Sequence, residues 1–110
     1  METASTGEWR DLLPDADLGV TPKAMMADGR ALVVWRTASG RVCVLDDDCP
    51  HQGTELSGGS VDGETLRCPK HGWAVGTDGW CDQAAASTPS HRVQVRDGMI
   101  TVRLRQARPR

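Results

Sequence analysis

Apolar and polar positions alternate most regularly near the end of the chain, on either side of Asp97-Gly98. This pair tolerates the positive φ angles of a two-residue turn, so the flanking residues are expected to form an antiparallel hairpin. The resulting register places apolar residues opposite apolar ones and polar opposite polar: Val95 with Ile100, Val93 with Val102, Gln94 with Thr101, and Arg92 with Arg103. The arginine pair mildly opposes this register unless both side chains point into solvent.

Similar patterns predict further strands upstream. Residues 23–27 and 30–35 flank Asp28-Gly29, and residues 41–45 follow a short turn at 38–40. Two more Asp-Gly pairs, at 62–63 and 78–79, predict further turns. No segment shows a capped amphipathic helix, and Pro14 limits residues 11–18 to one helical turn. We therefore expect an all-β fold, an antiparallel β-sandwich or partly open barrel with two loops at one end.

The length of 110 residues fits a single domain. The chain has four Trp but neither Phe nor Tyr, so Val, Leu, Ile, Met and Ala must build the core. It contains no repeat and no interdomain linker. We expect one domain over residues 1–110, with its core at about 8–104. The N-terminus and the Arg-rich C-terminal tail are expected to be flexible.

Charge and cysteine content exclude several classes of protein. The formal net charge is -2, but four of the thirteen basic residues lie in the tail, which leaves nine basic against fifteen acidic residues elsewhere. A nucleic-acid-binding body usually has the opposite sign. No apolar run approaches the roughly twenty residues that cross a bilayer, and residues 1–8 lack the features of a signal peptide. Four cysteines without an export signal favour metal binding in the cytoplasm over a disulfide framework.

Two short segments carry the candidate chemistry. Cys49-Pro50-His51 and Cys68-Pro69-Lys70-His71 each offer one thiolate and one imidazole, and sixteen residues separate His51 from Cys68. Two Cys and two His can hold a [2Fe-2S] cluster in which one iron has thiolate ligands and the other has imidazole ligands. The same four residues can also hold a structural zinc ion, although zinc ligand pairs more often have two to four residues between them, and Cys49-x-His51 has one. A third hypothesis keeps the cluster but assigns it a regulatory role.

Residues 49–54, 57–59 and 68–73 resemble the Rieske family, especially its soluble bacterial ferredoxins and the N-terminal domains of ring-hydroxylating oxygenases. The resemblance covers roughly residues 8–104. It implies a Rieske-like β fold with a two-loop cluster-binding subdomain and one Rieske-type [2Fe-2S] cluster per chain. It also implies that Cys49 and Cys68 bind the buried iron, while His51 and His71 bind the outer iron.

The chain departs from the quinol-oxidising respiratory members of this family. Those members have an extra Cys in each of the two ligand-bearing loops, where this chain has Thr54 and Lys70. They also have Ser and Tyr hydroxyls that donate to the cluster, where this chain has Trp73 and Val75. Fewer donors stabilise the reduced state less, so the potential is expected near the low end of the Rieske range, about -150 mV. Val75 also differs from the Phe usual in the ferredoxin branch.

The resemblance implies an electron carrier rather than an enzyme. We expect a ferredoxin component that carries one electron from a flavin-dependent ferredoxin reductase to a Rieske-type or other terminal oxygenase, and that is a monomer when free. An oxygenase needs a mononuclear iron held by two His and a carboxylate, and only His91 remains unassigned. The alternatives are a small subunit or Rieske domain of a multicomponent oxidoreductase, either an oxygenase or nitrite reductase-like, and a structural zinc-binding module.

Several other residues receive simpler interpretations. Cys43 is expected to pack inside a strand, and Cys81 to have a packing role while partly exposed. His91 is interpreted as a surface or strand-end histidine. Trp73 is expected to shield the cluster from water. Asp46-Asp47-Asp48 is interpreted as a solvated loop, with docking of a redox partner as the alternative.

Overall fold

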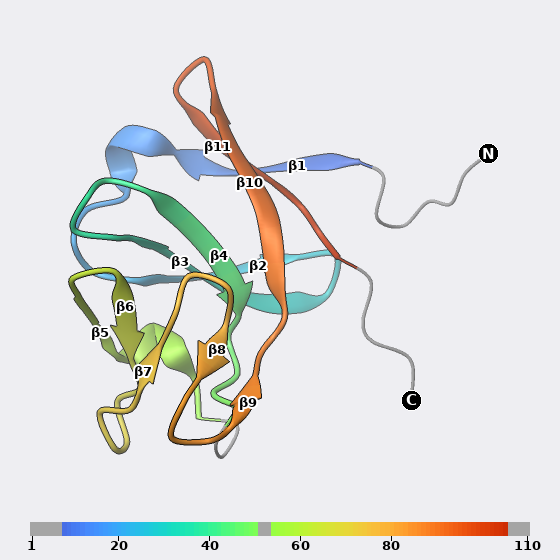
Figure 1. Cartoon of the computed structure of the whole chain (residues 1–110). Helices are drawn as coiled ribbons and strands as arrows, with labels where there is room; N and C mark the ends of the chain where they lie inside the picture. Colours follow the sequence, from blue (N-terminus) through green and yellow to red (C-terminus); the bar gives the residue numbers. More distant parts are fainter. Residues whose placement is uncertain (1–7, 51–53, 106–110) are drawn as a thin grey trace.

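The computed structural model describes residues 8–50 and 54–105 (Figure 1). The expected flexible ends, residues 1–7 and 106–110, lie outside this part of the chain. The elements in chain order are β1 (Trp9–Pro14), η2 (Asp15–Asp17), β2 (Lys23–Ala27), β3 (Arg30–Arg36), β4 (Val42–Asp46), η3 (Leu56–Gly58), β5 (Ser60–Asp62), β6 (Thr65–Arg67), β7 (Ala74–Val75), β8 (Trp80–Cys81), β9 (Ala86–Ser87), β10 (Ser90–Arg96) and β11 (Met99–Arg103). The expected all-β antiparallel fold is confirmed, and no described helix is long and apolar enough to cross a membrane.

The described strands form one large sheet and two small ones. The six-stranded sheet has the order β1-β11-β10-β4-β3-β2, and all of its pairs are antiparallel. The small sheets have the orders β5-β6-β7 and β8-β9. Figure 1 shows the short strands β5 to β9 at one end of the molecule, away from the β10–β11 turn. The expected pair of loops at one end belongs to this part.

The Asp-Gly pairs predicted two hairpins correctly. At both Asp28-Gly29 and Asp97-Gly98 the two residues have positive φ, as a two-residue turn of this kind requires. The predicted register of β10 and β11 is confirmed, including Arg92 opposite Arg103. At the third pair the prediction was wrong by one residue, because Asp62 is the last residue of β5 and the turn consists of Gly63 and Glu64. At the fourth pair, only Gly79 has a positive φ.

The first strand was not predicted. β1 pairs with β11 from Trp9 opposite Arg103 to Pro14 opposite Met99, with an irregularity between Asp11 and Leu13. The irregular register interrupts the alternation of apolar and polar residues by which a strand is recognised in a sequence. The expected helical turn within residues 11–18 is a short 3-10 helix, η2, which begins after Pro14.

Strands β3 and β4 are buried on both faces. One face contributes Leu32, Val34 and Val44 to a core shared with β1 and β11, which supply Leu13, Ile100 and Val102. The opposite face contributes Val33, Trp35, Cys43 and Leu45 to a second core, shared with Leu56, Leu66, Val75 and Cys81 of the short elements. This explains why the two strands read as continuous apolar runs rather than as alternating ones. The pair is therefore the middle layer of the molecule.

Two glycines allow the short strands to pack closely. A Cβ atom on Gly59 would lie 1.8 Å from the carbonyl oxygen of Arg67, and one on Gly79 would lie 2.0 Å from that of Thr88. Both neighbours are backbone atoms, which cannot rotate away as a side chain can. Gly59 lies between η3 and β5, so it fixes how the chain after the first loop approaches the strand before the second.

We predict that Gly59→Ala lowers the free energy of unfolding by about 2 kcal/mol or more, as overpacking against backbone requires. Gly19→Ala is the matched control, because nothing lies within 4 Å of a Cβ atom there and its φ is not positive. Urea unfolding followed by tryptophan fluorescence measures both variants. Equal stability of the two would contradict the close approach of Gly59 to Arg67.

Candidate metal centre

Both cysteines of the predicted ligand set lie in the core. Cys49 and Cys68 are each 2% exposed and belong to the same apolar cluster as Trp35 and Leu56. His71 is exposed, and His51 lies outside the described residues. The two loops, residues 47–57 (the first arm) and residues 68–73 (the second arm), therefore bring two thiols inside and at least one imidazole to the surface. Within the described residues, no group of three or more His, Cys, Asp or Glu side chains is arranged so that it could hold a metal ion.

The two arms close in the same way. The backbone N–H of Cys49 donates to the carbonyl of Thr54 at 2.8 Å, and that of Cys68 donates to the carbonyl of Trp73 at 2.9 Å. In each arm the acceptor lies five residues after the Cys, although the His follows the Cys by two residues in the first arm and by three in the second. The shared closure gives the two cysteines equivalent backbone environments.

The second arm has additional support on its outer side. The N–H of Gly72, whose φ is 72°, donates to the carbonyl of Cys68 at 2.9 Å. Arg67 donates to the carbonyl of Gly72 at 2.8 Å and forms an ion pair with Asp62 at 2.8 Å. Arg67 thus connects the end of the arm to the β5–β6 hairpin.

The first arm is held at its base by Asp47. This residue is 8% exposed, and its carboxylate accepts hydrogen bonds from the N–H and the hydroxyl of Ser57, each at 2.7 Å. Its backbone N–H donates to the carbonyl of Ala31, in β3, at 2.9 Å. Asp47 therefore ties both ends of the arm to the middle layer. This contact could not be predicted from the sequence, because Asp47 and Ser57 are ten residues apart in an irregular segment.

The interpretation of Asp46-Asp47-Asp48 as a solvated loop was therefore wrong. Asp46 is the last residue of β4, Asp47 is buried, and only Asp48 is exposed. Two of the three carboxylates thus have partners within the fold. Only the carboxylate of Asp48 is exposed and could take part in docking a redox partner.

The two arms also lie beside each other. A Cβ atom on Gly58 would lie 3.6 Å from Cγ of Pro69, so η3, in which the first arm ends, passes close to the second arm. The rings of His71 and Trp73 have centroids 5.6 Å apart at an angle of 36°. Trp73 is half-buried and packs against the group of buried apolar residues that includes Cys49 and Cys68. Shielding of a metal cluster by Trp73 stays a prediction.

The other two cysteines pack in the core, as expected. Burial raises the pKa of Cys43 to about 11, with a further contribution from Glu64 and an opposing one from Arg41. Cys81 is 0% exposed, so the expectation of partial exposure was wrong. None of the four cysteines, all of which the structure describes, forms a disulfide.

His91 is buried at the start of β10 rather than on the surface. Its side chain is 0% exposed, its Nδ1 accepts from the N–H of Arg105 at 3.0 Å, and its Nε2 lies 2.8 Å from Oδ1 of Asp46. Because a backbone N–H can only donate, Nε2 carries the hydrogen that is donated to Asp46. Arg30 donates to both oxygens of the same carboxylate at 3.0 Å. His91 therefore has a structural role between β4 and the end of β11.

The donor set fits an iron–sulfur cluster. Thiolates are the usual ligands of such clusters, and the combination of two Cys with two His is the mixed set in which imidazoles replace two of the thiolates. The dry surroundings of Cys49 and Cys68, together with the exposure of His71, would give such a group one shielded side and one accessible side.

Comparisons with known proteins agree with this site. A family model described as the Rieske [2Fe-2S] domain matches residues 8–102. The oxygenase component of 3-ketosteroid-9-alpha-monooxygenase from Mycobacterium tuberculosis is 37% identical over 89 residues, which are 74% of this chain and 23% of that protein. Aminopyrrolnitrin oxygenase PrnD from Pseudomonas fluorescens is 31% identical over 94 residues, 86% of this chain and 25% of that protein.

Solved structures contain a similar fold. Apo dicamba monooxygenase superposes with a TM-score of 0.85 at 25% identity, over 92% of this chain and 34% of that one. NdmA from Pseudomonas putida CBB5 superposes with a TM-score of 0.80 at 26% identity, over 88% of this chain and 34% of that one. The chain thus spans about a quarter of the two curated relatives and a third of these two solved chains.

The contacts of Asp46 with His91 and Arg30, here called the Asp46 network, predict a pH dependence of stability. Burial opposes ionisation of Asp46, but the hydrogen bonds from His91 and Arg30 and the positive charge of Arg30 outweigh it, so the pKa of Asp46 is lowered. Its contribution to stability is complete above the ordinary Asp pKa of about 3.9 and is lost as the pH falls through the lower folded-state value. We expect Asp46→Asn to reduce stability at pH 7 and to flatten the decline below pH 4. Asp48→Asn, on an exposed residue, is the control, and an identical acid decline in wild type and Asp46→Asn would contradict the network.

Proposed function

Because the chain belongs to the Rieske [2Fe-2S] domain family, we propose that it works as the ferredoxin component that carries one electron between a flavin-dependent reductase and a terminal oxygenase. A Rieske-type [2Fe-2S] cluster is the cofactor of this family, and electron transfer is the function of the domain. The observation that carries the proposal is the placement of two buried thiols beside an exposed imidazole on adjacent arms.

In this proposal the four predicted residues are the cluster ligands, one cluster per chain. Cys49 and Cys68 hold the inner iron, which their burial supports, while His51 and His71 hold the outer iron. The exposed ring of His71 then gives a partner protein short access to the cofactor. Val75 is fully buried and, like Trp73, offers no hydroxyl, which supports a low reduction potential.

The chain supplies the relay and not the oxygenation chemistry in this proposal. A mononuclear iron site of the oxygenase type needs two His and a carboxylate. Apart from the predicted ligands, His91 is the one remaining histidine, and it is engaged with Asp46 and Arg105 inside the fold. We therefore propose that the chain itself is an electron carrier rather than an enzyme. The excess of acidic side chains outside the tail and four cysteines without a disulfide support a cytoplasmic protein that binds neither nucleic acid nor membrane.

A second candidate is the Rieske domain of an oxygenase component. The curated relatives described above are oxygenases or oxygenase components, and they are about four times as long as the matched region. In that case the same residues relay the electron to an iron site elsewhere in a larger protein. An immunoblot of the source cells separates the two, because the carrier has a mass of 11.9 kDa and the oxygenase component is several-fold larger.

Protein-film voltammetry tests the proposal. We expect a reversible one-electron wave at about -150 mV, the low end of the Rieske range. His51→Ala and His71→Ala should abolish the wave, because each removes one ligand of the outer iron. His91→Gln is the control: it alters a buried histidine that is not a ligand and should keep the wave. A strongly positive potential would contradict the low-potential carrier, and loss of the wave in His91→Gln alone would overturn the ligand assignment.

A further inference from the structure

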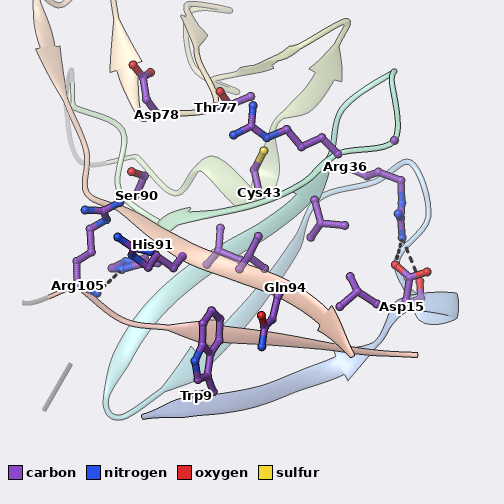
Figure 2. A pocket seen from close by; sticks show the side chains of 17 residues that line it. Trp9, Asp15, Arg36, Cys43, Thr77, Asp78, Ser90, His91, Gln94 and Arg105 are labelled. Atoms are coloured by element: carbon purple, nitrogen blue, oxygen red, sulfur yellow. Dashed lines mark hydrogen bonds and ion pairs between the residues drawn. The ribbon is translucent and has the colours of Figure 1, made fainter. Parts of the chain in front are cut away.

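Strands β4 and β10 separate after only two paired positions. They pair at Ser90–Leu45 and His91–Val44, after which β10 continues beside β11 while β4 continues beside β3. A groove of about 940 Å³ lies where they part. In Figure 2, Cys43 lies toward Thr77 and Asp78, and Gln94 and Trp9 lie on the opposite side.

On β4, the backbone of Val42 faces this groove. The N–H of Thr37 donates to the carbonyl of Arg41, so Arg41 and the residues that alternate with it direct their backbone groups toward β3. The N–H of Asp46 donates to the carbonyl of Pro89, so the even-numbered residues of β4 point toward β10. Val42 is one of these, and β10 no longer reaches it.

On β10, Val93 and Val95 face the same groove. The two-residue turn makes Arg96 and Met99 a hydrogen-bonded pair, so the even-numbered residues of β10 bond to β11. The odd-numbered residues point toward β4, as the pairing of His91 with Val44 confirms. Within the part of the chain that the structure describes, the groove-facing backbone groups of Val93 and Val95 therefore have no partner strand.

The groove is positively charged although the chain is acidic. Four arginines and two aspartates line it. Arg36 forms an ion pair with Asp15 at 2.8 Å. The other charged side chains that line the groove are three cations, Arg41, Arg92 and Arg105, and one anion, Asp78. Arg41 and Arg92 are exposed. The groove thus combines an open strand edge with valine side chains and an excess of cations.

We propose that this groove binds an extended, acidic segment of a partner protein, which adds a strand alongside β10. Backbone hydrogen bonds to Val93 and Val95 supply the pairing, as in other cases of strand addition to a free edge. The arginines select carboxylates, with which guanidinium groups form strong charge-assisted hydrogen bonds. Thr77 and Asp78, in the turn after β7, line one end of the groove, so the bound segment lies next to the part of the molecule that carries the arms. The inference is independent of electron transfer, and its failure would leave the proposed function unaffected.

The test is binding of a terminally blocked peptide of alternating valine and glutamate to the cluster-containing protein, measured by calorimetry at low salt. Arg41→Glu/Arg92→Glu should weaken binding by about tenfold or more, since charge reversal places like charges together. The double variant Lys23→Glu/Arg96→Glu has the same net charge but alters exposed residues that do not line the groove, and it should bind within about twofold of wild type.

A second pair of measurements separates strand pairing from simple charge attraction. The same peptide N-methylated at every residue has no backbone donors on either edge and should bind weakly. The unmodified peptide should slow hydrogen exchange over residues 92–96. Absence of binding, equal binding of the N-methylated peptide, or equal weakening by the two double variants would each overturn the proposal.

Discussion

Burial of both faces of β3 and β4 is the constraint on which the rest of the structure depends. One face packs against β1 and β11, and the other packs against the short strands that carry the arms. The two cores therefore share one layer, and the first arm begins directly after β4. Asp47, the first residue of this arm, binds Ser57 and thereby fixes the loop to this layer. The position of Cys49 is a consequence of β4 more than of the loop's own sequence.

The regular part of the fold could be predicted because its signals are local. Asp28-Gly29 and Asp97-Gly98 adopt the positive φ angles that their residue types favour, and the alternation beside them fixes the register. β1 escaped prediction because its register is irregular, and Asp62-Gly63 misplaced a turn because only the glycine requires a special conformation. The continuous apolar runs of β3 and β4 identified strands, but a layer buried on both faces depends on packing that no short pattern reveals.

The same distinction applies to the site. The two Cys-Pro segments are visible in the sequence because metal ligands have restricted spacing, and both cysteines lie in one apolar cluster. The supporting contacts were not predictable, since Asp47 with Ser57 and Arg67 with Gly72 join residues in loops. His91 does lie at the end of a strand, but its burial could not be predicted because its partners, Asp46 and the N–H of Arg105, are distant in sequence. The inner side of the arms, with both cysteines, is therefore buried, while His71 and the groove between β4 and β10 are accessible to solvent.

The central claim is that the two arms together hold a [2Fe-2S] cluster through two thiolates and two imidazoles. The electron paramagnetic resonance spectrum of the dithionite-reduced protein, purified without oxygen, tests it most directly. We expect a reddish protein whose reduced signal has the low average g value of a histidine-ligated [2Fe-2S] centre, because imidazole ligands make the two irons inequivalent. A colourless protein that contains stoichiometric zinc after anaerobic reconstitution has failed would contradict it and would make the same four residues a structural zinc site.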